Sequence, residues 1–368
     1  MARESAVASP LVQWFLWLAI AGISLLILIY GRPFLLPVVV AFLVFTVLSA
    51  GINRVSRLRL GGFALPHWLA ASVGLALLLV ILLVLYSVVS GELLLIVAEW
   101  PRIVERLQAF AARVSDWLGE DIEEALRAAY ASFNVVSAFR SVVTPAGAAL
   151  TSIIVVVLYV AFMFVESAAF PTKVAKLFAD DPQRAGEVSE VARQITRSVH
   201  RYLLLKTVLS AGNTLAVYAI MRLVGLEFAE TWALLTFFLN FIPKIGSITA
   251  TIVPSLFALL QFTDWQPIAI VVVGVAAAHT LTGEVVEPMV MGKTLNLSSL
   301  VIMLSLTFWA MVWGVAGTFL AVPLMVVILI ICSKVPMLRP VAILLSGDGD
   351  IPVAQPPAAA ADKAAGRA

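Results

Sequence analysis

Three titratable side chains lie close together in the C-terminal half of this sequence, at the end of a long apolar run. His279 precedes Glu284 by five residues, and Glu287 follows Glu284 by three. Histidine titrates at about pH 6.5 and glutamate at about pH 4.3, and burial beside a second acid raises the pKa of a glutamate. Glutamates three residues apart share one face of a helix. We therefore predict a proton-coupling site at Glu284 and Glu287 with His279 as relay; solvated acids and an interfacial histidine are the alternatives.

Amide and lysine side chains interrupt two other apolar runs. Asn213 lies inside one of them, and Asn240 opens residues 240–246 in the other, which read NFIPKIG. Within a membrane an asparagine bonds to another helix, caps a helix or contacts a solute, and a lysine reaches a lipid headgroup or binds the solute. We place five of these residues on a predicted solute pathway: Asn213, Asn240, Pro243, Lys244 and Gly246.

No pattern typical of an intramembrane enzyme or an ATP-driven pump occurs in the sequence. The His-Glu-x-x-His motif of zinc proteases and the P-loop motif of ATPases are both absent. The single cysteine, Cys332, gives neither an intramolecular disulfide nor a cysteine-based zinc site. Residues 347–350 match the Gly-x-Gly-Asp tetrapeptide of intramembrane aspartyl proteases, but they lie in a polar tail. We predict no enzyme activity, catalytic residue, metal site or cofactor, and no nucleic-acid partner.

The composition of the chain is typical of a membrane protein. Of 368 residues, 62% are apolar and 12% are charged, whereas a soluble globular chain has about 25% charged residues. Because about 20 apolar residues span a bilayer as a helix, we predict an all-α polytopic membrane protein surrounded by lipid. Its six full spans are residues 11–30, 34–52, 68–90, 142–165, 202–226 and 265–283.

Two further apolar segments do not fit single spans. Residues 228–263 are interrupted at 243–246, and residues 294–333 are interrupted at 313–317. The second segment would make about 60 Å of helix, twice the thickness of a bilayer core. We predict that both fold back as helical hairpins, re-entrant rather than fully spanning, although residues 245–263 alone are nearly long enough to span. Gly314, Gly317 and Pro323 join the predicted pathway, because broken helices at membrane depth are typical of secondary transporters.

Lysine and arginine give the predicted orientation. The loop after the second span holds Arg54, Arg57 and Arg59 and no acid, which places it and the N-terminus in the cytoplasm. The predicted divisions are residues 1–91, the first three spans; 92–140, an external amphipathic helical insert; 141–166, the fourth span; 167–201, a cytoplasmic amphipathic helix over 173–201; 202–333, a transport core with both hairpins; and 334–368, a cytoplasmic, disordered tail.

The external insert carries an apolar stripe at helical spacing. Ile103, Leu107, Phe110, Val114 and Trp117 follow one another at intervals of four and three residues. Such a stripe either packs on the protein's own transmembrane bundle or makes a contact in a homo-oligomer, and two heptads do not decide between them.

Three motifs, in this order, resemble the autoinducer-2 exporter family of bacterial membrane proteins. They are residues 240–246; Glu284-x-x-Glu287-Pro288 with Gly292-Lys293; and Trp313-Gly314-x-x-Gly317 with Ala321-Val322-Pro323. The resemblance implies a multi-span and oligomeric transporter of small solutes, located in the bacterial inner membrane. The charge bias, with Lys334 and Arg339 in the tail, places both termini in the cytoplasm. Export of signalling molecules and cation/proton antiport have both been ascribed to members. The sequence departs from the family at residues 244–247, where members commonly have an aromatic residue first and proline after the glycine.

These observations favour a secondary transporter that exports a small solute, for example a signalling molecule such as autoinducer-2. A sodium/proton antiporter is the alternative within transport, and the coupling ion would then be sodium as well as the proton. A membrane scaffold that uses the insert to bind partners is the alternative from another class, although a scaffold has no need of broken helices at membrane depth.

Overall fold

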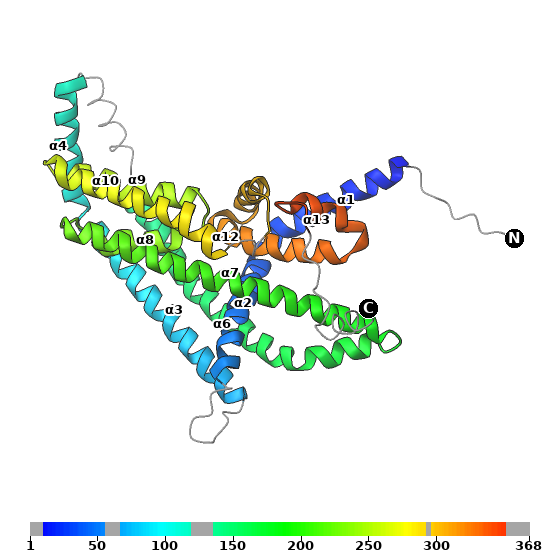
Figure 1. Ribbon diagram of the computed structural model, residues 1–368. Coiled ribbons are helices and arrows are strands. Elements are labelled where there is room, and N and C mark those ends of the chain that lie inside the picture. Colours follow the sequence, from blue (N-terminus) through cyan, green and yellow to red (C-terminus); the bar gives the residue numbers. More distant parts are fainter. Residues whose placement is uncertain (1–9, 56–66, 119–134, 292–295, 351–368) are drawn as a thin grey trace, which may run out of the picture.

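The computed structural model describes residues 10–55, 67–118, 135–291 and 296–350. Figure 1 shows these residues as a bundle of helices, with no β-strand in this part of the chain beyond one isolated bridge between Leu297 and Ser346. The helices are α1 (Pro10–Tyr30), α2 (Arg32–Val55), α3 (His67–Ala98), α4 (Trp100–Leu118), α6 (Val135–Leu177), α7 (Pro182–Leu223), α8 (Ala229–Leu239), α9 (Ile245–Gln261), α10 (Trp265–Thr280), the π-helix η1 (Leu281–Val286), α11 (Glu287–Met291), α12 (Ser299–Lys334), the 3-10 turn η3 (Pro336–Leu338) and α13 (Arg339–Leu345).

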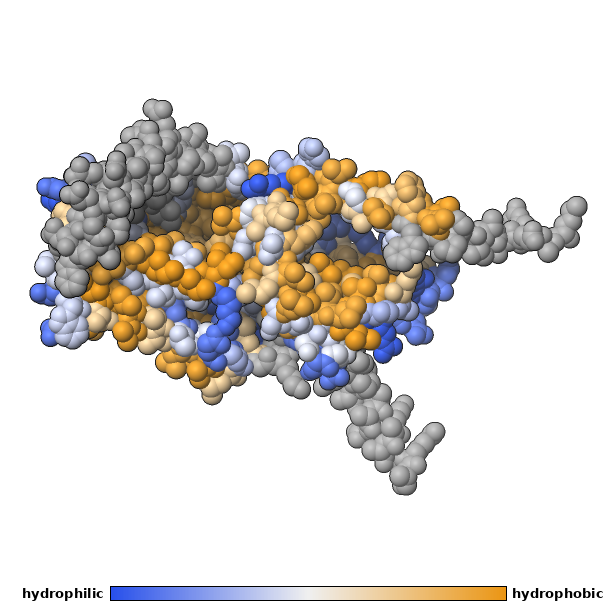
Figure 2. All heavy atoms as spheres, turned by 90° about the horizontal axis from the view of Figure 1, so that it is seen from above, coloured by the Kyte–Doolittle hydropathy of each residue, from blue (hydrophilic) through white to orange (hydrophobic). Residues whose placement is uncertain are grey.

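The predicted fold class is confirmed. In the described part of the chain six helical stretches are long and apolar enough to cross a membrane. Five of them, in α2, α3, α6, α7 and the α10–α11 unit, fall on predicted spans. The sixth is α12, which was predicted to fold back, whereas the apolar stretch of α1 is shorter, Phe15–Tyr30. Hydrophobic residues form a broad band across the coloured part of the face in Figure 2, and hydrophilic residues lie mainly at its ends and along its edges. The chain is therefore an all-α polytopic membrane protein, because only such a surface is stable against lipid.

The predicted cytoplasmic helix over residues 173–201 is wrong as a single helix. Helix α6 ends at Leu177, and α7 begins at Pro182 and runs antiparallel to it (Figure 1). Asp181 caps α7 by accepting a hydrogen bond from the backbone N–H of Arg184 at 3.0 Å. An aspartate before a proline is a strong helix start, so the Asp-Pro pair divides the segment into the ends of two long helices.

The first predicted hairpin is confirmed as helices α8 and α9, joined by residues 240–244. The turn centres on Lys244, whose φ of 62° and ψ of −59° let the Ile245 N–H donate to the Pro243 carbonyl at 2.7 Å. This is a γ-turn, a strained conformation for a residue with a side chain. Helix α8 has 11 residues, about 16 Å of helix, so it cannot cross a bilayer alone.

The second predicted break is also confirmed, at Gly314 within α12. Gly314 has φ 65° and ψ −145°, a conformation that glycine adopts readily. The two arms fold back on each other, since the Ser305 hydroxyl donates to the Ala321 carbonyl at 3.4 Å. Sixteen residues of straight helix would separate those groups by about 24 Å. Re-entrant insertion of either hairpin stays a prediction.

The two hairpins pack on each other through their tips. Ile242 of the first lies in a buried cluster with Leu306, Trp309 and Trp313 of the second. The Trp313 indole N–H also donates to the Leu28 carbonyl in α1 at 2.9 Å. Apolar side chains of the second hairpin therefore pack against the turn of the first hairpin.

Helix α4 packs on its own chain over the part of the insert that the structure describes. Ile103 lies against a buried cluster formed by α7, α8, α9 and α10. Arg106 donates two hydrogen bonds to the carboxylate of Glu227, at 2.7 and 2.9 Å. These contacts favour the first interpretation of the apolar stripe. The second half of the predicted insert, residues 119–134, lies outside the described residues, and an oligomer contact stays a prediction.

The Arg106–Glu227 pair predicts that acid loosens α4. The Arg106 guanidinium holds the pKa of Glu227 below its ordinary value through hydrogen bonds. A lowered pKa in the folded state means that the pair stabilises the fold above the ordinary glutamate pKa and is lost as the pH falls through the lowered value. The protection of the α4 amides, measured as exchange relative to that of an unstructured chain at the same pH, should therefore fall below about pH 4, and Glu227→Gln should remove this step.

A matched control is Glu99→Gln, which breaks an ion pair with Arg102 at the beginning of α4 without detaching the helix. Its exchange profile should keep the acid step. Equal profiles for Glu227→Gln and the wild type would contradict the proposed role of this contact.

Candidate functional site

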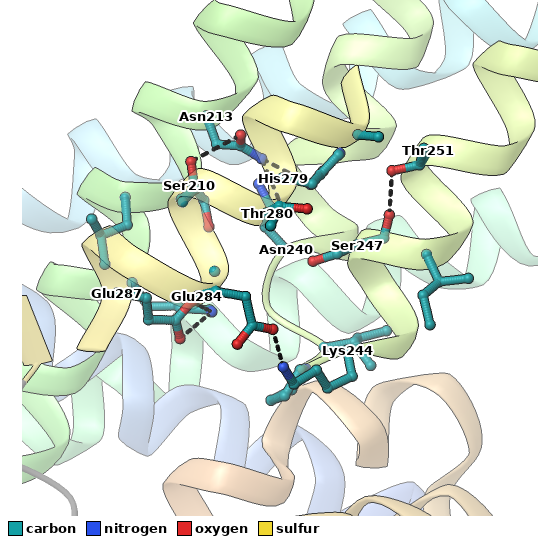
Figure 3. A pocket seen from close by; sticks show the side chains of 18 of the residues that line it. Ser210, Asn213, Asn240, Lys244, Ser247, Thr251, His279, Thr280, Glu284 and Glu287 are labelled. Carbon is teal, nitrogen blue, oxygen red and sulfur yellow. Dashed lines mark hydrogen bonds and ion pairs between the residues drawn. The ribbon is translucent and has the colours of Figure 1, made fainter. Parts of the chain in front are cut away.

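A cavity of about 510 Å³ lies between α7, the hairpin α8–α9 and the unit α10–η1–α11 (Figure 3). Seven of the residues singled out in the sequence line it: Asn213, Asn240, Pro243, Lys244, His279, Glu284 and Glu287. They come from four elements and the hairpin turn, across 75 residues of sequence. The volume is in the range of small-molecule sites, about 300–1,000 Å³.

One face of α7 supplies a row of buried polar groups to this cavity. Lys206, Ser210 and Asn213 follow at helical spacing, and each is at least 96% buried. Val199 and Val217, fully buried and apolar, continue the same face at either end. The row is about 10 Å long. Sequence reasoning missed Lys206 and Ser210 as site residues, yet polar residues at intervals of four and three within an apolar run are a signal that finds them.

The Asn213 side chain connects three elements. Its amide nitrogen donates to Asn240 Oδ1 at 3.3 Å and lies 3.1 Å from His279 Nδ1, and its oxygen accepts from the Thr282 hydroxyl at 3.1 Å. Asn213 therefore makes the hydrogen bonds between helices that the sequence offered as one alternative, and it lines the cavity, whereas contact with a solute stays a prediction. Asn240 is the C-cap residue of α8, and its side chain accepts the hydrogen bond from Asn213 of α7.

With the Asn213 amide oriented so that its oxygen accepts from Thr282, the network favours one tautomer of His279 and one orientation of Asn240. Because His279 Nδ1 accepts from Asn213, the proton of a neutral imidazole lies on Nε2. Because Asn240 Oδ1 accepts from Asn213, the nitrogen of Asn240 faces the other way. Among the described residues, Asn240 Nδ2, His279 Nε2 and Ser210 Oγ have no hydrogen-bond partner although they are buried. Two of these three groups are donors only, and the third is a hydroxyl.

The two glutamates do not form the acid pair that the sequence predicts. Glu287 accepts from Lys206 Nζ at 2.6 and 2.8 Å, and Glu284 accepts from Lys244 Nζ (Figure 3). Each acid thus faces a lysine from another element. The predicted pairing of the two acids is therefore wrong, because the nearest charged group to each is a lysine and not the other acid.

A π-helix explains why the two acids diverge. Glu284 lies in η1 and Glu287 begins α11, so the helical register changes between them. A π-turn inserts one extra residue, and such bulges are frequent at functional sites. Here it directs Glu284 toward the tip of the first hairpin and Glu287 toward α7.

Comparison with known proteins assigns the family. The family described as AI-2E family transporter matches residues 15–337 of the chain. The AI-2 transport protein TqsA of Escherichia coli strain K12 is 28% identical over 322 residues, which are 86% of this chain and 90% of that protein. A putative transport protein of Haemophilus influenzae is 27% identical over 329 residues, 87% of this chain and 90% of that protein.

The chain belongs to the AI-2E transporter family. It is an integral membrane transporter, and the family resemblance seen in its three motifs is confirmed. Of the second motif, Gly292 and Lys293 lie outside the described residues.

Four predicted pathway residues of this AI-2E transporter do not line the cavity: Gly246, Gly314, Gly317 and Pro323. A Cβ at Gly246 would lie 1.7 Å from the Leu239 carbonyl oxygen, and one at Gly317 would lie 2.0 Å from the Trp309 carbonyl oxygen. The two glycines therefore let the arms of their own hairpins touch. A place on the solute pathway stays a prediction for all four residues.

Proposed function

We propose that this AI-2E transporter is a secondary transporter that exports a small, oxygen-rich polar solute, with autoinducer-2 as the first candidate. The name of the Escherichia coli relative suggests that solute, and export is the direction that the family resemblance implies. No P-loop motif occurs in the chain, so the proposed driving force is an ion gradient rather than ATP.

The unpaired donors around Asn213 carry this proposal. Asn240 Nδ2, His279 Nε2 and the Ser210 hydroxyl belong to residues that line one cavity, and all three atoms lack a partner. Each buried donor left unpaired costs about 1–3 kcal/mol. Hydroxyl, carbonyl or carboxylate oxygens of a bound solute would accept from these groups after small side-chain rotations. The cavity therefore favours a solute that presents several oxygen acceptors within a few ångströms.

Everted membrane vesicles test the function directly. Vesicles that contain the protein should accumulate autoinducer-2 faster than vesicles without it, with saturation, when a proton gradient is imposed. A pH change on addition of sodium, with no solute movement, would favour sodium/proton antiport instead. Failure to move autoinducer-2 and other small oxygen-rich solutes would contradict the proposal.

Two serines provide a matched pair of variants. Ser210 and Ser255 both carry a buried hydroxyl with no partner, but only Ser210 lines the cavity. Ser210→Ala should weaken the apparent affinity for the solute about fivefold, which corresponds to one lost hydrogen bond of about 1 kcal/mol. Ser255→Ala should leave it unchanged. Equal affinities for the two variants in the vesicle assay would remove Ser210 from the binding site.

A further inference from the structure

A lysine and a glutamate from distant parts of the chain form a largely buried ion pair at one end of the cavity. The Lys206 side chain is 5% exposed and that of Glu287 is 28% exposed, whereas Lys244 and Glu284 are 58% and 57% exposed. A buried ammonium group is stable only when an anion compensates its lost hydration. Lys206 therefore depends on an anionic partner more strongly than Lys244 does.

Lys206 has hydrogen-bonding capacity left for a solute. An ammonium group has three N–H donors, and the two hydrogen bonds of Lys206 both go to Glu287. The Ser210 hydroxyl lies one turn further along α7, and Asn240 Nδ2 and His279 Nε2 belong to the same cavity wall. Near Lys206 the cavity thus combines the ammonium group of this lysine with three neutral donor groups. This is the chemistry that binds a carboxylate or phosphate oxygen.

The charge balance of the cavity constrains how an anion can enter it. Two lysines and two glutamates line the cavity, so their charges sum to zero when all four are ionised. An additional anion would leave one buried negative charge without compensation, which is costly within a membrane. The charge returns to zero if one glutamate takes up a proton as the anion binds.

We propose that Lys206 is the anion-binding residue of the transport site and that Glu287 is its exchangeable partner. An anionic oxygen of the solute takes the place of the Glu287 carboxylate at Lys206 Nζ, and the displaced carboxylate takes up one proton from water. Anion binding is thus linked to proton uptake at Glu287, whichever side of the membrane later receives the proton. The inference rests on the proposed function and narrows its solute to one that carries a carboxylate or phosphate-like group when bound.

The surroundings of Glu287 leave Lys206 as its ion-pair partner among the described residues. The other titratable or charged groups around it are Tyr202 on α7, Glu284 on η1 with its partner Lys244 on the first hairpin, and His279 on α10. Helix α12 contributes the apolar Val322 to this region, in a buried cluster with Tyr202 and Met291. Glu284 already has Lys244, and a neutral His279 carries no charge.

A pair of four-carbon probes separates charge from hydrogen bonding. Erythronate and erythritol have similar sizes and hydroxyl groups, but only erythronate carries a carboxylate. Purified full-length protein in weakly buffered detergent should be stabilised against heat by erythronate far more than by erythritol. A pH dye should record uptake of about one proton for each erythronate bound, because Glu287 takes up the proton that balances the anion.

The variant Glu287→Gln makes the sharpest prediction, because it should improve binding. If Glu287 occupies Lys206 for about nine-tenths of the time, removal of this competitor raises the affinity for erythronate about tenfold. Proton uptake on binding should disappear. Lys206→Met should abolish erythronate binding. The double variant Lys206→Met with Glu287→Met leaves no unpaired buried charge, so it should fold normally and still fail to bind erythronate.

The controls distinguish this inference from the proposed function. Glu166→Gln breaks the exposed pair with Lys173, far from the cavity, and should behave as the wild type. The inference is overturned if Glu287→Gln binds erythronate no better than the wild type, or if Glu284→Gln and not Glu287→Gln abolishes proton uptake. Autoinducer-2 flux is measured separately in vesicles. If the wild type transports autoinducer-2 but Glu287→Gln binds erythronate no better than the wild type, only the inference is rejected. If erythronate binding is linked to proton uptake but autoinducer-2 is not transported, only the proposed solute is rejected.

Discussion

Alanine in place of Gly246 or Gly317 is expected to cause the largest loss of stability among glycine-to-alanine changes in the described part of the chain. The new Cβ would lie 1.7 Å from the Leu239 carbonyl oxygen at position 246 and 2.0 Å from the Trp309 carbonyl oxygen at position 317. Both neighbours are backbone atoms of the opposite arm of the hairpin. An arm must therefore shift, and overpacking of this kind costs about 3 kcal/mol.

The measurement is the thermal unfolding of purified variants, together with solute flux in vesicles. Both variants should melt several degrees below the wild type. Transport should fall as well, because displacement of the first hairpin moves Asn240 and Lys244. Gly212→Ala is the matched control: it lies on an exposed face of α7 with nothing within 4 Å of the added Cβ, so it should stabilise the helix slightly. Normal melting of both hairpin variants would show that the arms separate easily.

Loss of the Asn213 side chain is expected to cause the largest loss of transport. Asn213→Leu conserves most of the volume but removes the partner of Thr282, Asn240 and His279 at once. Each polar group left unpaired in a buried site costs about 1–3 kcal/mol, and the cavity donors lose their fixed orientation. Transport efficiency should fall about a hundredfold or more, which corresponds to about 2.7 kcal/mol.

Two further variants distinguish hydrogen bonding from packing. Thr214→Val removes the neighbouring buried hydroxyl, which has no partner and does not line the cavity, so transport should persist. Asn213→Ser adds no buried charge and supplies a hydroxyl that replaces at most one of the three hydrogen-bond partners. Its transport should lie between those of the wild type and Asn213→Leu. Flux of Asn213→Leu within a few-fold of the wild type would contradict the role of this residue as the centre of the site.

The sequence alone determined which parts of the chain are helical, apolar and broken. Long uncharged runs can only form helices that face lipid or one another, and the local properties of proline and glycine interrupt them. The breaks at residues 240–244 and at Gly314 were therefore predictable. The division at Asp181-Pro182 is equally local, because an aspartate before a proline is a helix-start signal. The apolar periodicity that continues across this pair predicts one helix instead of two.

The tertiary structure decided which of the polar residues act together. Hydropathy predicted that both hairpins form the solute pathway together with the polar residues. In the structure the second hairpin packs through apolar side chains and contributes no residue to the cavity wall. The spacing of Glu284 and Glu287 indicated an acid pair. Glu284 lies in the π-helix and Glu287 begins the α-helix after it, and each side chain bonds to a different lysine. Lys206 meets Glu287 from 81 residues away. Such partners depend on how each helix is rotated and shifted against its neighbours, which is fixed by close packing of the whole bundle and not by any local run of residues.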